Sequence, residues 1–325
     1  MRLAPLALAL CLAGLSSAAF GSAADIEGLL KVRDPGALAK AQAFVEANEA
    51  NARAWVLLAR AQLQKGEADE AVESAEQAVE LAPNDAQAQF WLGNSLGVRI
   101  GQVNMLRKMA MAPDLRDAFE AAVRLDGNLL DARSRLIQFY LQAPAAVGGG
   151  VEKAQAQQAE IAKRNPARGH LAEATIQRAH FEDNAAAMRA IDAAVAAVPA
   201  LPADDIDTRI SVGGTLVALE RYDDAHAYYL AWAAAQPRHA APHYQLGRLA
   251  AVSGRFLEEG SAGLKRYLDA GLTRGDNDPG DTAAWWRLGQ IQAKQGDTAT
   301  ARASFQTALR LDPDNTEAKK SLDAL

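Results

Sequence analysis

The sequence predicts an all-α protein built as a solenoid of helix–turn–helix repeats, and three observations favour this fold class. Two segments, 52–85 and 282–315, have large, small and proline residues at the same relative positions. Equivalent residues of the two segments differ in number by 230. Apolar residues in both segments recur every three or four positions, which is the period of a helix. Half of the chain is hydrophobic, much of it Ala, and only 6% is aromatic. Such a composition favours helices in close contact.

The segment 282–315 predicts two antiparallel helices joined by a short turn. Their inward stripes are Trp285, Leu288 and Gln292 on the first helix, and Ala301, Phe305 and Ala308 on the second. Gly289 has no side chain, so the second helix can approach the first there. Gly296 and Asp297 suit the turn, because Gly can take a left-handed cap and Asp can cap the next helix. Pro313 ends the second helix. One hairpin cannot bury its apolar face alone, so neighbouring hairpins must stack on it.

The same frame recurs in 52–85, at Trp55, Leu58, Ala59, Gly66, Ala71, Ala75, Ala78 and Pro83. The pattern resembles the tetratricopeptide repeat, a helix–turn–helix unit of about 34 residues. This resemblance implies a right-handed α-α superhelix with a concave groove, and a protein-binding scaffold rather than an enzyme. The turn with Phe139-Tyr140, Ala143-Pro144 and glycines at 148–150, combined with an enlarged second repeat, resembles a group of exported bacterial proteins of this family.

The repeat frame extends over nearly all of the chain and predicts its organisation. A signal peptide at 1–24 precedes capping helices at 25–51, repeats one to three at 52–168, a degenerate fourth repeat at 169–205, repeats five to seven at 206–315 and a capping helix at 316–325. The second repeat is enlarged by about ten residues around 97–113, and the third by a long turn after Leu141. Residues 201–205 indicate a bend between two halves.

Residues 1–24 are typical of a secretory signal, with Arg2, an apolar run that ends at Leu15, and small residues before a cleavage site after Ala24. We therefore expect a periplasmic or secreted protein. An N-terminal membrane anchor is the alternative, although the run is short for a span. Cys11 is the only cysteine and lies in the signal, so the mature chain has no disulfides. No later segment is long and apolar enough to cross a bilayer.

Charge and motif content narrow the classes of function. The formal net charge is −6, and a general nucleic-acid binder would need a basic stripe instead. We therefore expect protein or peptide partners, and we identify no catalytic constellation and no cofactor motif. His239 and His243 have the spacing of a metal pair on a helix. Pro242 lies between them, however, and no Cys or Glu partner is evident, which favours ordinary turn residues and no metal.

The two enlarged repeats carry unusual residues. A cluster such as Met105, Met109 and Met111 most often fills a gap in a core or forms an adaptable contact surface. A Cu(I) site is the alternative. The glycine run at 148–150 lacks the Lys-Ser or Lys-Thr that a phosphate loop needs. It favours a turn that folds back over its own repeat, with an anion-binding backbone nest as the alternative.

In peptide-binding members of the resembled family, two positions of each first helix often touch ligand: the residue after the aromatic position, and the residue four further on. In this chain these positions hold Val56, Phe90, Ser134, Ile210, Tyr244 and Trp286, and then Arg60, Asn94, Gln138, Gly214, Arg248 and Gln290. None of them is acidic. Aromatic rings, Arg and amides suit an extended peptide, because rings cover apolar side chains while Arg and amides bond carboxylates and backbone. We predict a peptide-binding groove formed by Arg60, Phe90, Asn94, Gln138, Tyr244, Arg248, Trp286 and Gln290.

The function predicted from these observations is a non-enzymatic periplasmic scaffold or adaptor that binds a partner peptide or helix in its concave groove. Two other classes stay open. One is an accessory factor for cell-envelope or membrane-protein assembly, with the enlarged repeats as the contact. The other is a metal-handling protein or an enzyme that uses the Met-rich insert and the Gly-rich turn.

Overall fold

The computed structural model describes residues 22–31, 34–269, 271–274 and 278–325, and within these ranges the chain folds into seventeen α-helices. The first eight are α1 Ala23–Lys31, α2 Ala37–Ala47, α3 Ala52–Lys65, α4 Ala68–Leu81, α5 Ala86–Gln102, α6 Met105–Leu125, α7 Leu130–Gln142 and α8 Val151–Arg164. The others are α9 Pro166–Ala179, α10 Asn184–Ala197, α11 Ile206–Ala218, α12 Tyr222–Ala235, α13 Ala240–Ser253, α14 Leu257–Leu268, α15 Asp281–Lys294, α16 Thr298–Leu311 and α17 Thr316–Asp323.

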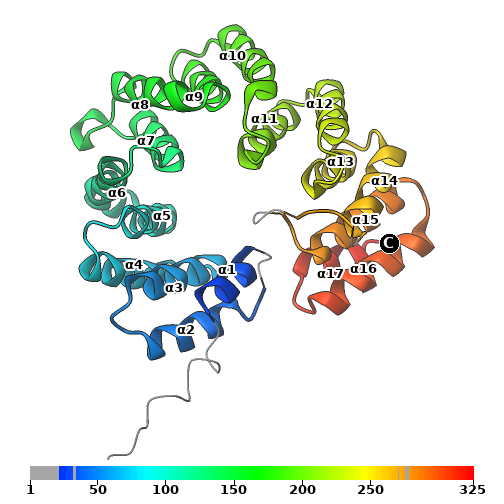
Figure 1. The fold of residues 1–325 in the computed structure, drawn as a ribbon, viewed down its shortest axis with the longest axis horizontal. Helices are drawn as coiled ribbons and strands as arrows, with labels where there is room; N and C mark the ends of the chain where they lie inside the picture. The colour runs from blue at the N-terminus through cyan, green and yellow to red at the C-terminus, as the bar shows by residue number, and fades with distance from the viewer. Residues whose placement is uncertain (1–21, 32–33, 270, 275–277) are drawn as a thin grey trace, which may run out of the picture.

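The helices pack in consecutive antiparallel pairs that follow one another around a curve, which confirms the predicted all-α solenoid (Figure 1). The first helix of each pair lines the inside of the curve and the second helix covers the outside. Two short 3-10 helices, Ala145–Val147 and Val198–Ala200, interrupt this series. No helix of the described ranges is both long and apolar enough to cross a membrane. Most of the predicted signal peptide, residues 1–21, lies outside the described residues.

The curve is so tight that the first and last repeats approach each other (Figure 1). A small cavity of about 150 Å³ is lined from both ends of the solenoid. One end is formed by Asp34, which precedes α2, and by Ala61 and Lys65 of α3. The other end is formed by Asp312 and Asp314 in the turn before α17. The inner surface therefore faces a central space that the chain almost encircles.

A small residue near the middle of several first helices decides how the hairpin packs. A side chain added at Gly289 would lie 2.6 Å from the ring of Phe305, and one added at Gly213 would lie 2.4 Å from the ring of Tyr229. In each of these hairpins an aromatic ring of the second helix therefore fills the space above the glycine. In the first repeat the equivalent residues are Ala59 and Ala75, both fully buried. The glycines thus serve a large partner side chain rather than a close approach of bare backbones.

The extra residues of the second repeat are helical rather than a loop. Helix α5 has 17 residues and α6 has 21, whereas α3 and α4 have 14 each. The expectation that the methionines fill the core is wrong for Met105, which is 71% exposed. A Cu(I) site is not favoured either, because Met109 and Met111 point about 200° apart around α6. The insert lengthens one hairpin beyond its neighbours.

The glycine-rich turn folds back over the end of α7. The amides of Gly148, Gly149 and Gly150 donate to the carbonyls of Ala145, Pro144 and Tyr140 at 3.0, 3.1 and 2.9 Å. A Cβ at Gly149 would lie only 1.7 Å from a backbone oxygen, so this position requires glycine. Because all three amides have internal acceptors, the turn does not present the free N–H groups that an anion-binding nest would need.

The fourth repeat is formed by α9 and α10 and begins slightly earlier than the sequence pattern suggests, with Pro166 as the first residue of α9. The chain then passes through the bend at 201–205 into α11. Helix α11 packs less closely on α9 and α10 than other first helices pack on their preceding pairs. This looser junction opens a cavity on the inner surface.

The connection between α14 and α15 is longer than the other turns and reaches the inner surface. Thr273 is bound to the start of α13 by two main-chain hydrogen bonds, Ala240 N to Thr273 O at 2.9 Å and Thr273 N to Arg238 O at 2.7 Å. Arg274 forms an ion pair with Asp281 at 2.5 Å and lies over the ring of Tyr267. These contacts hold the described parts of the connection against α13.

Candidate functional site: a groove on the inner surface

A cavity of about 660 Å³ opens on the inner surface between α11, α13 and α15, and we call it the arginine pocket. Its lining residues are Ile210, Ser211, Gly214, Thr215 and Ala218 of α11, Tyr244, Gln245 and Arg248 of α13, Arg287 of α15 and Pro279 of the preceding connection. None of them is acidic, although the whole chain carries a net charge of −6. The pocket therefore presents two guanidinium groups without a carboxylate in its wall.

Arg248 is the central cation of the arginine pocket. Within the described ranges it makes no hydrogen bond and no ion pair, and it lies half-buried among the lining residues. The nearest atom to a Cβ built on Gly214 is Nη1 of Arg248, at 3.9 Å, so the missing side chain leaves space beside the guanidinium. A half-buried guanidinium without a partner favours a negatively charged ligand group.

Arg287 and Tyr244 form the opposite wall. Arg287 donates to Gln290 Oε1 at 3.1 Å and its guanidinium lies 4.3 Å from the ring of Trp286. Tyr244 is buried and packs on Tyr267 with ring centroids 5.2 Å apart. Burial raises the pKa of Tyr244, although the charge of Arg287 and a hydrogen bond from it act in the other direction. The phenol is therefore neutral at physiological pH.

Three buried polar atoms in or near the arginine pocket lack a hydrogen-bond partner in the described part of the chain. They are Oε1 of Gln245, Nε of Arg287 and Oη of Tyr229. Burial raises the pKa of Tyr229, and the charge of Arg248 opposes this rise, so Tyr229 lies within the field of Arg248. Buried polar groups are normally satisfied by protein, water or ligand. Gln245 and Arg287 thus bring an unsatisfied acceptor and an unsatisfied donor to the pocket wall, whereas Tyr229 is fully buried behind it.

A second cavity, of about 380 Å³, adjoins the first along α11, and we call it the apolar pocket. Its lining residues are Leu171, Ala174, Thr175 and Arg178 of α9, Asn184, Ala187, Met188 and Ile191 of α10, and Thr215, Ala218 and Leu219 of α11 and its end. Thr215 and Ala218 line both cavities. The two pockets therefore meet at Thr215 and Ala218 of α11, and we call them together the groove: its walls are mostly apolar, with Arg178 at one side, between α9 and α11, and cationic between α11 and α15.

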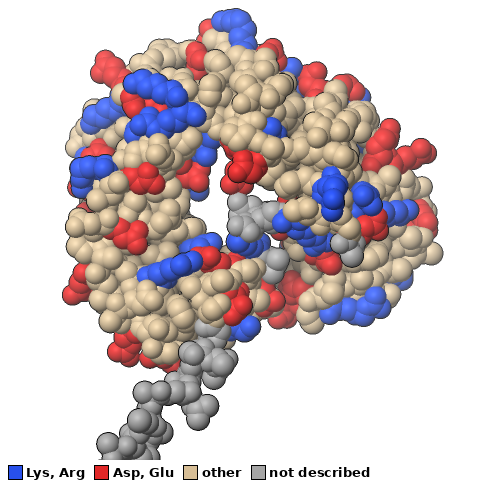
Figure 2. Space-filling model, in the orientation of Figure 1, with Lys and Arg blue, Asp and Glu red and all other residues tan. Residues whose placement is uncertain are grey.

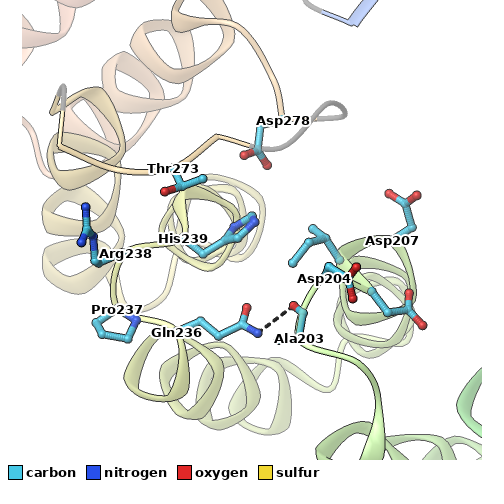
Figure 3. A pocket seen from close by; sticks show the side chains of 11 residues that line it. Ala203, Asp204, Asp207, Gln236, Pro237, Arg238, His239, Thr273 and Asp278 are labelled. Atoms are coloured by element: carbon cyan, nitrogen blue, oxygen red, sulfur yellow. Dashed lines mark hydrogen bonds between the residues drawn. The ribbon is translucent and has the colours of Figure 1, made fainter.

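A third cavity, of about 810 Å³, lies at the N-terminal ends of α11 and α13 (Figure 3). Asp204 and Asp207 lie across it from His239 and Asp278, and Gln236 donates to the Ala203 carbonyl at 2.8 Å. In the described ranges no three or more His, Cys, Asp or Glu side chains form a group that could hold a metal ion. Of these carboxylates, Asp278 directly precedes Pro279 of the arginine pocket and is itself buried.

The structure divides the predicted groove residues into two sets. Tyr244 and Arg248 line the arginine pocket together with the equivalent residues Ile210 and Gly214 of the fifth repeat. Gln290 is half-buried and holds Arg287. Trp286 turns toward the last helix, where its Nε1 donates to Ser321 at 3.0 Å. The fifth and sixth repeats therefore supply most of the lining, and the seventh repeat adds Arg287, which Gln290 holds.

The predicted residues of the first three repeats are occupied by their own neighbours. The guanidinium of Arg60 lies 4.9 Å from the ring of Trp91. Phe90 packs on Trp91 and Phe119, and Asn94 donates to the Phe90 carbonyl of its own helix at 2.9 Å. Gln138 is exposed on α7, where it accepts a bond from Arg135 at 3.4 Å. None of these residues lines the arginine pocket or the apolar pocket.

Sequence reasoning missed Arg287 and Gln245 of the arginine pocket and Met188 of the apolar pocket. Arg287 stands next to Trp286, one residue from a predicted ligand position, so a wider window on each first helix would have included it. The apolar pocket had no sequence signal, because it arises from the spread of α11 away from α9 and α10.

Comparisons with known proteins support the repeat assignment. Family models of the tetratricopeptide repeat match residues 52–85 and 282–315, the two segments whose spacing agrees in the sequence. No curated protein matches the chain. Because two hairpins of the helical series are repeats of this family, the chain is a tetratricopeptide repeat protein. Proteins of this class generally serve as scaffolds for protein–protein interaction.

Solved structures of such proteins are similar to the chain at low identity. A thermophilic tetratricopeptide repeat protein from Thermus thermophilus is 18% identical, with a TM-score of 0.46, over 60% of this chain and 100% of that one. A tetratricopeptide repeat protein from Parabacteroides merdae is 13% identical, with a TM-score of 0.43, over 92% of this chain and 95% of that one.

Proposed function

We propose that this protein is an adaptor that captures an extended segment of a partner protein in the groove of its C-terminal half. The observation that supports this most directly is the state of Arg248, a half-buried cation without an internal partner in a wall without acidic residues. A carboxylate of the partner would bond Arg248 and Arg287, because charge-assisted hydrogen bonds to guanidinium are strong and directional. The repeat fold supplies the rigid inner surface on which such a segment lies.

The apolar pocket defines the other end of the proposed ligand. Ile191, Met188 and Leu219 offer apolar contact on the far side of Thr215 and Ala218. Neighbouring helices pack about 8–10 Å apart, so the groove from α9 to α15 spans roughly 25–30 Å. An extended chain advances about 3.3 Å per residue, and the groove therefore suits about eight residues. We expect an apolar side chain near one end of the bound segment and a carboxylate near the other.

A random-peptide selection on the protein tests this proposal. Peptides of ten residues would be displayed with free C-termini, and the affinity of selected peptides measured by fluorescence polarisation. Arg248→Glu should weaken binding at least ~10-fold, because one charge-assisted bond contributes about 1.5–3 kcal/mol and the new carboxylate repels the ligand. Arg60→Glu is the matched control, since Arg60 occupies the same repeat position but is covered by Trp91.

Three results would contradict the groove assignment. One is equal peptide affinity of wild type and Arg248→Glu. The second is an equal loss in Arg248→Glu and Arg60→Glu, which would indicate a general charge effect. The third is undiminished binding of a selected peptide after its C-terminus is amidated and its Asp and Glu residues are replaced by Asn and Gln, because the two guanidinium groups would then have no role in recognition.

The proposal includes location and class of function. The apolar run and small residues at 1–24 are typical of exported proteins, so we propose that the protein acts in the periplasm or outside the cell. Fractionation with N-terminal sequencing should return a chain that starts at Asp25, and an intact cytoplasmic chain would contradict this.

We propose that the protein has no catalytic step, because the groove offers cations and apolar walls without a nucleophile and base pair.

A further inference from the structure

The hairpin of the second repeat, formed by α5 and α6, is longer than the hairpin of the first repeat. We call residues 98–109, at the junction of α5 and α6, the hairpin tip. Helices α5 and α6 are three and seven residues longer than the 14 residues of α3 and α4. At about 1.5 Å per residue, the tip extends roughly 4–10 Å past the neighbouring turn.

The hairpin tip carries the most exposed large apolar side chains in the described part of the molecule. Leu106 is 82% exposed and Met105 is 71% exposed, whereas Leu311, the next, is 53% exposed. These two residues are adjacent in the first turn of α6. Neighbouring apolar side chains with this much exposure favour an interaction surface, because single scattered residues are common but clusters are not.

The charge of this stretch is opposite to that of the whole chain. No acidic residue occurs between Asp85 and Asp114, while Arg99, Arg107 and Lys108 occur there. Arg99 forms an ion pair with Asp69 at 2.6 Å. Arg107 and Lys108 form no ion pair within the described ranges. The N-terminus of α6 adds partial positive charge at the same place, so the tip is both apolar and cationic.

The third repeat holds the base of the projecting helix. Arg116 of α6 donates to the Val147 carbonyl of the glycine-rich turn at 3.1 Å, and Glu120 of α6 accepts from the Tyr140 hydroxyl at 2.7 Å. Met105 lies eleven residues before Arg116, which is roughly 16 Å along the helix. The enlarged turn thus supports the part of α6 that follows Pro113, and the first turns of α6 lie beyond this supported part.

We propose that the hairpin tip docks on an anionic membrane surface, with Met105 and Leu106 at the boundary between head groups and acyl chains and with Arg107 and Lys108 beside lipid phosphates. A projecting tip with flexible apolar side chains fits between lipids without a complementary pocket, and neighbouring cations strengthen binding to anionic lipids. The described helices include none that could span a bilayer, so this contact is peripheral. The inference concerns a different repeat from the peptide groove and does not depend on it.

Vesicle co-sedimentation of the full chain tests the inference. The probe is vesicles of phosphatidylcholine in which about one lipid in three is phosphatidylglycerol. Vesicles of pure phosphatidylcholine are the comparison. We expect Met105→Asp with Leu106→Asp to lower partitioning onto anionic vesicles at least ~10-fold, because two apolar anchors are lost. Arg107→Gln with Lys108→Gln should lower it by roughly fivefold per cation at low salt. All variants keep the same N-terminal residues, so the differences report the tip.

Leu311→Asp is the matched control, because Leu311 is also exposed but lies on α16. It should bind vesicles like wild type. Thermal unfolding of the tip variants should be unchanged, since the replaced side chains are mostly exposed. The inference is overturned if the wild type does not bind anionic vesicles, if the tip variants bind equally well, or if Leu311→Asp loses as much. If the wild type does not bind vesicles but binds a protein partner that the tip variants lose, the tip contacts a protein and the membrane inference is wrong.

Discussion

Arg60 in the first repeat and Arg248 in the sixth occupy the same repeat position, eight residues after Ala52 and Ala240 respectively, yet their surroundings differ. The following first helix places Trp91 against Arg60, with the guanidinium 4.9 Å from the ring centroid. At the equivalent place after Arg248 the chain has Arg287. Burial lowers the pKa of Arg60, which indicates a covered side chain. A repeat position is thus open to a ligand only when the next repeat leaves it uncovered.

Charge on the molecular surface follows the same division. Positive and negative side chains are scattered over a mostly uncharged face in Figure 2, and both kinds border the central space. The arginine pocket is a local exception, with cations and no acidic lining residue. We infer that the C-terminal half is specialised for recognition, while the inner surface of the N-terminal half is stabilised by contacts among its own side chains.

The largest expected effect is on the free energy of unfolding, when the packing that holds α11 in the wall of the arginine pocket is disturbed. Gly213→Ala should lower the free energy of unfolding by about 1–3 kcal/mol, because the new Cβ would overlap the Tyr229 ring in a packed core. The adjacent Gly214→Ala is the matched control, since its nearest neighbour is at 3.9 Å and Ala favours helices by about 1 kcal/mol. Denaturant unfolding followed by circular dichroism measures both. Equal stability of the two variants would show that Tyr229 does not fix α11.

A smaller effect is expected when an aromatic ring covers Arg248, as Trp91 covers Arg60 in the first repeat. Arg287→Trp should weaken binding of a selected peptide by about tenfold, because a ring over Arg248 occupies the guanidinium face as Trp91 does for Arg60. Arg287→Ala should lose less, since it removes a cation without covering Arg248. Fluorescence polarisation distinguishes the two variants. If Arg287→Ala is the weaker binder, the uncovered state of Arg248 is not what matters.

The smallest expected effect is a pH dependence of stability from His243, which stands where Trp55 and Trp285 stand in the first and last repeats. Burial lowers the pKa of His243, with the Pro237 carbonyl acting against this and Arg266 adding to it. The neutral form is therefore preferred in the folded state, and the unfolded chain binds the proton more readily. Stability should be constant above the ordinary histidine pKa of about 6.5 and fall as the pH drops below it.

Unfolding midpoints measured from about pH 5 to about pH 8, which spans the ordinary histidine pKa of about 6.5, test this effect. Subtracting the profile of His243→Gln isolates the contribution of this residue from that of the other titrating groups. A difference profile without slope below about 6.5 would show that the imidazole is solvated in both states.

The sequence by itself determined the class of fold and the two best repeats, because hairpin packing depends on residues three, four and about thirty-four positions apart along one chain. Trp285, Gly289 and Phe305 are such local signals, and so are Tyr244 and Arg248 as positions of the inner surface. Only the tertiary structure decided that Arg248 is open while Arg60 is covered, that α11 separates from α9 to form the apolar pocket, and that the insert extends two helices. The physical reason is that access to an inner side chain depends on the residue that the next repeat places over it and on the angle between repeats, and neither is written in the spacing of a single repeat.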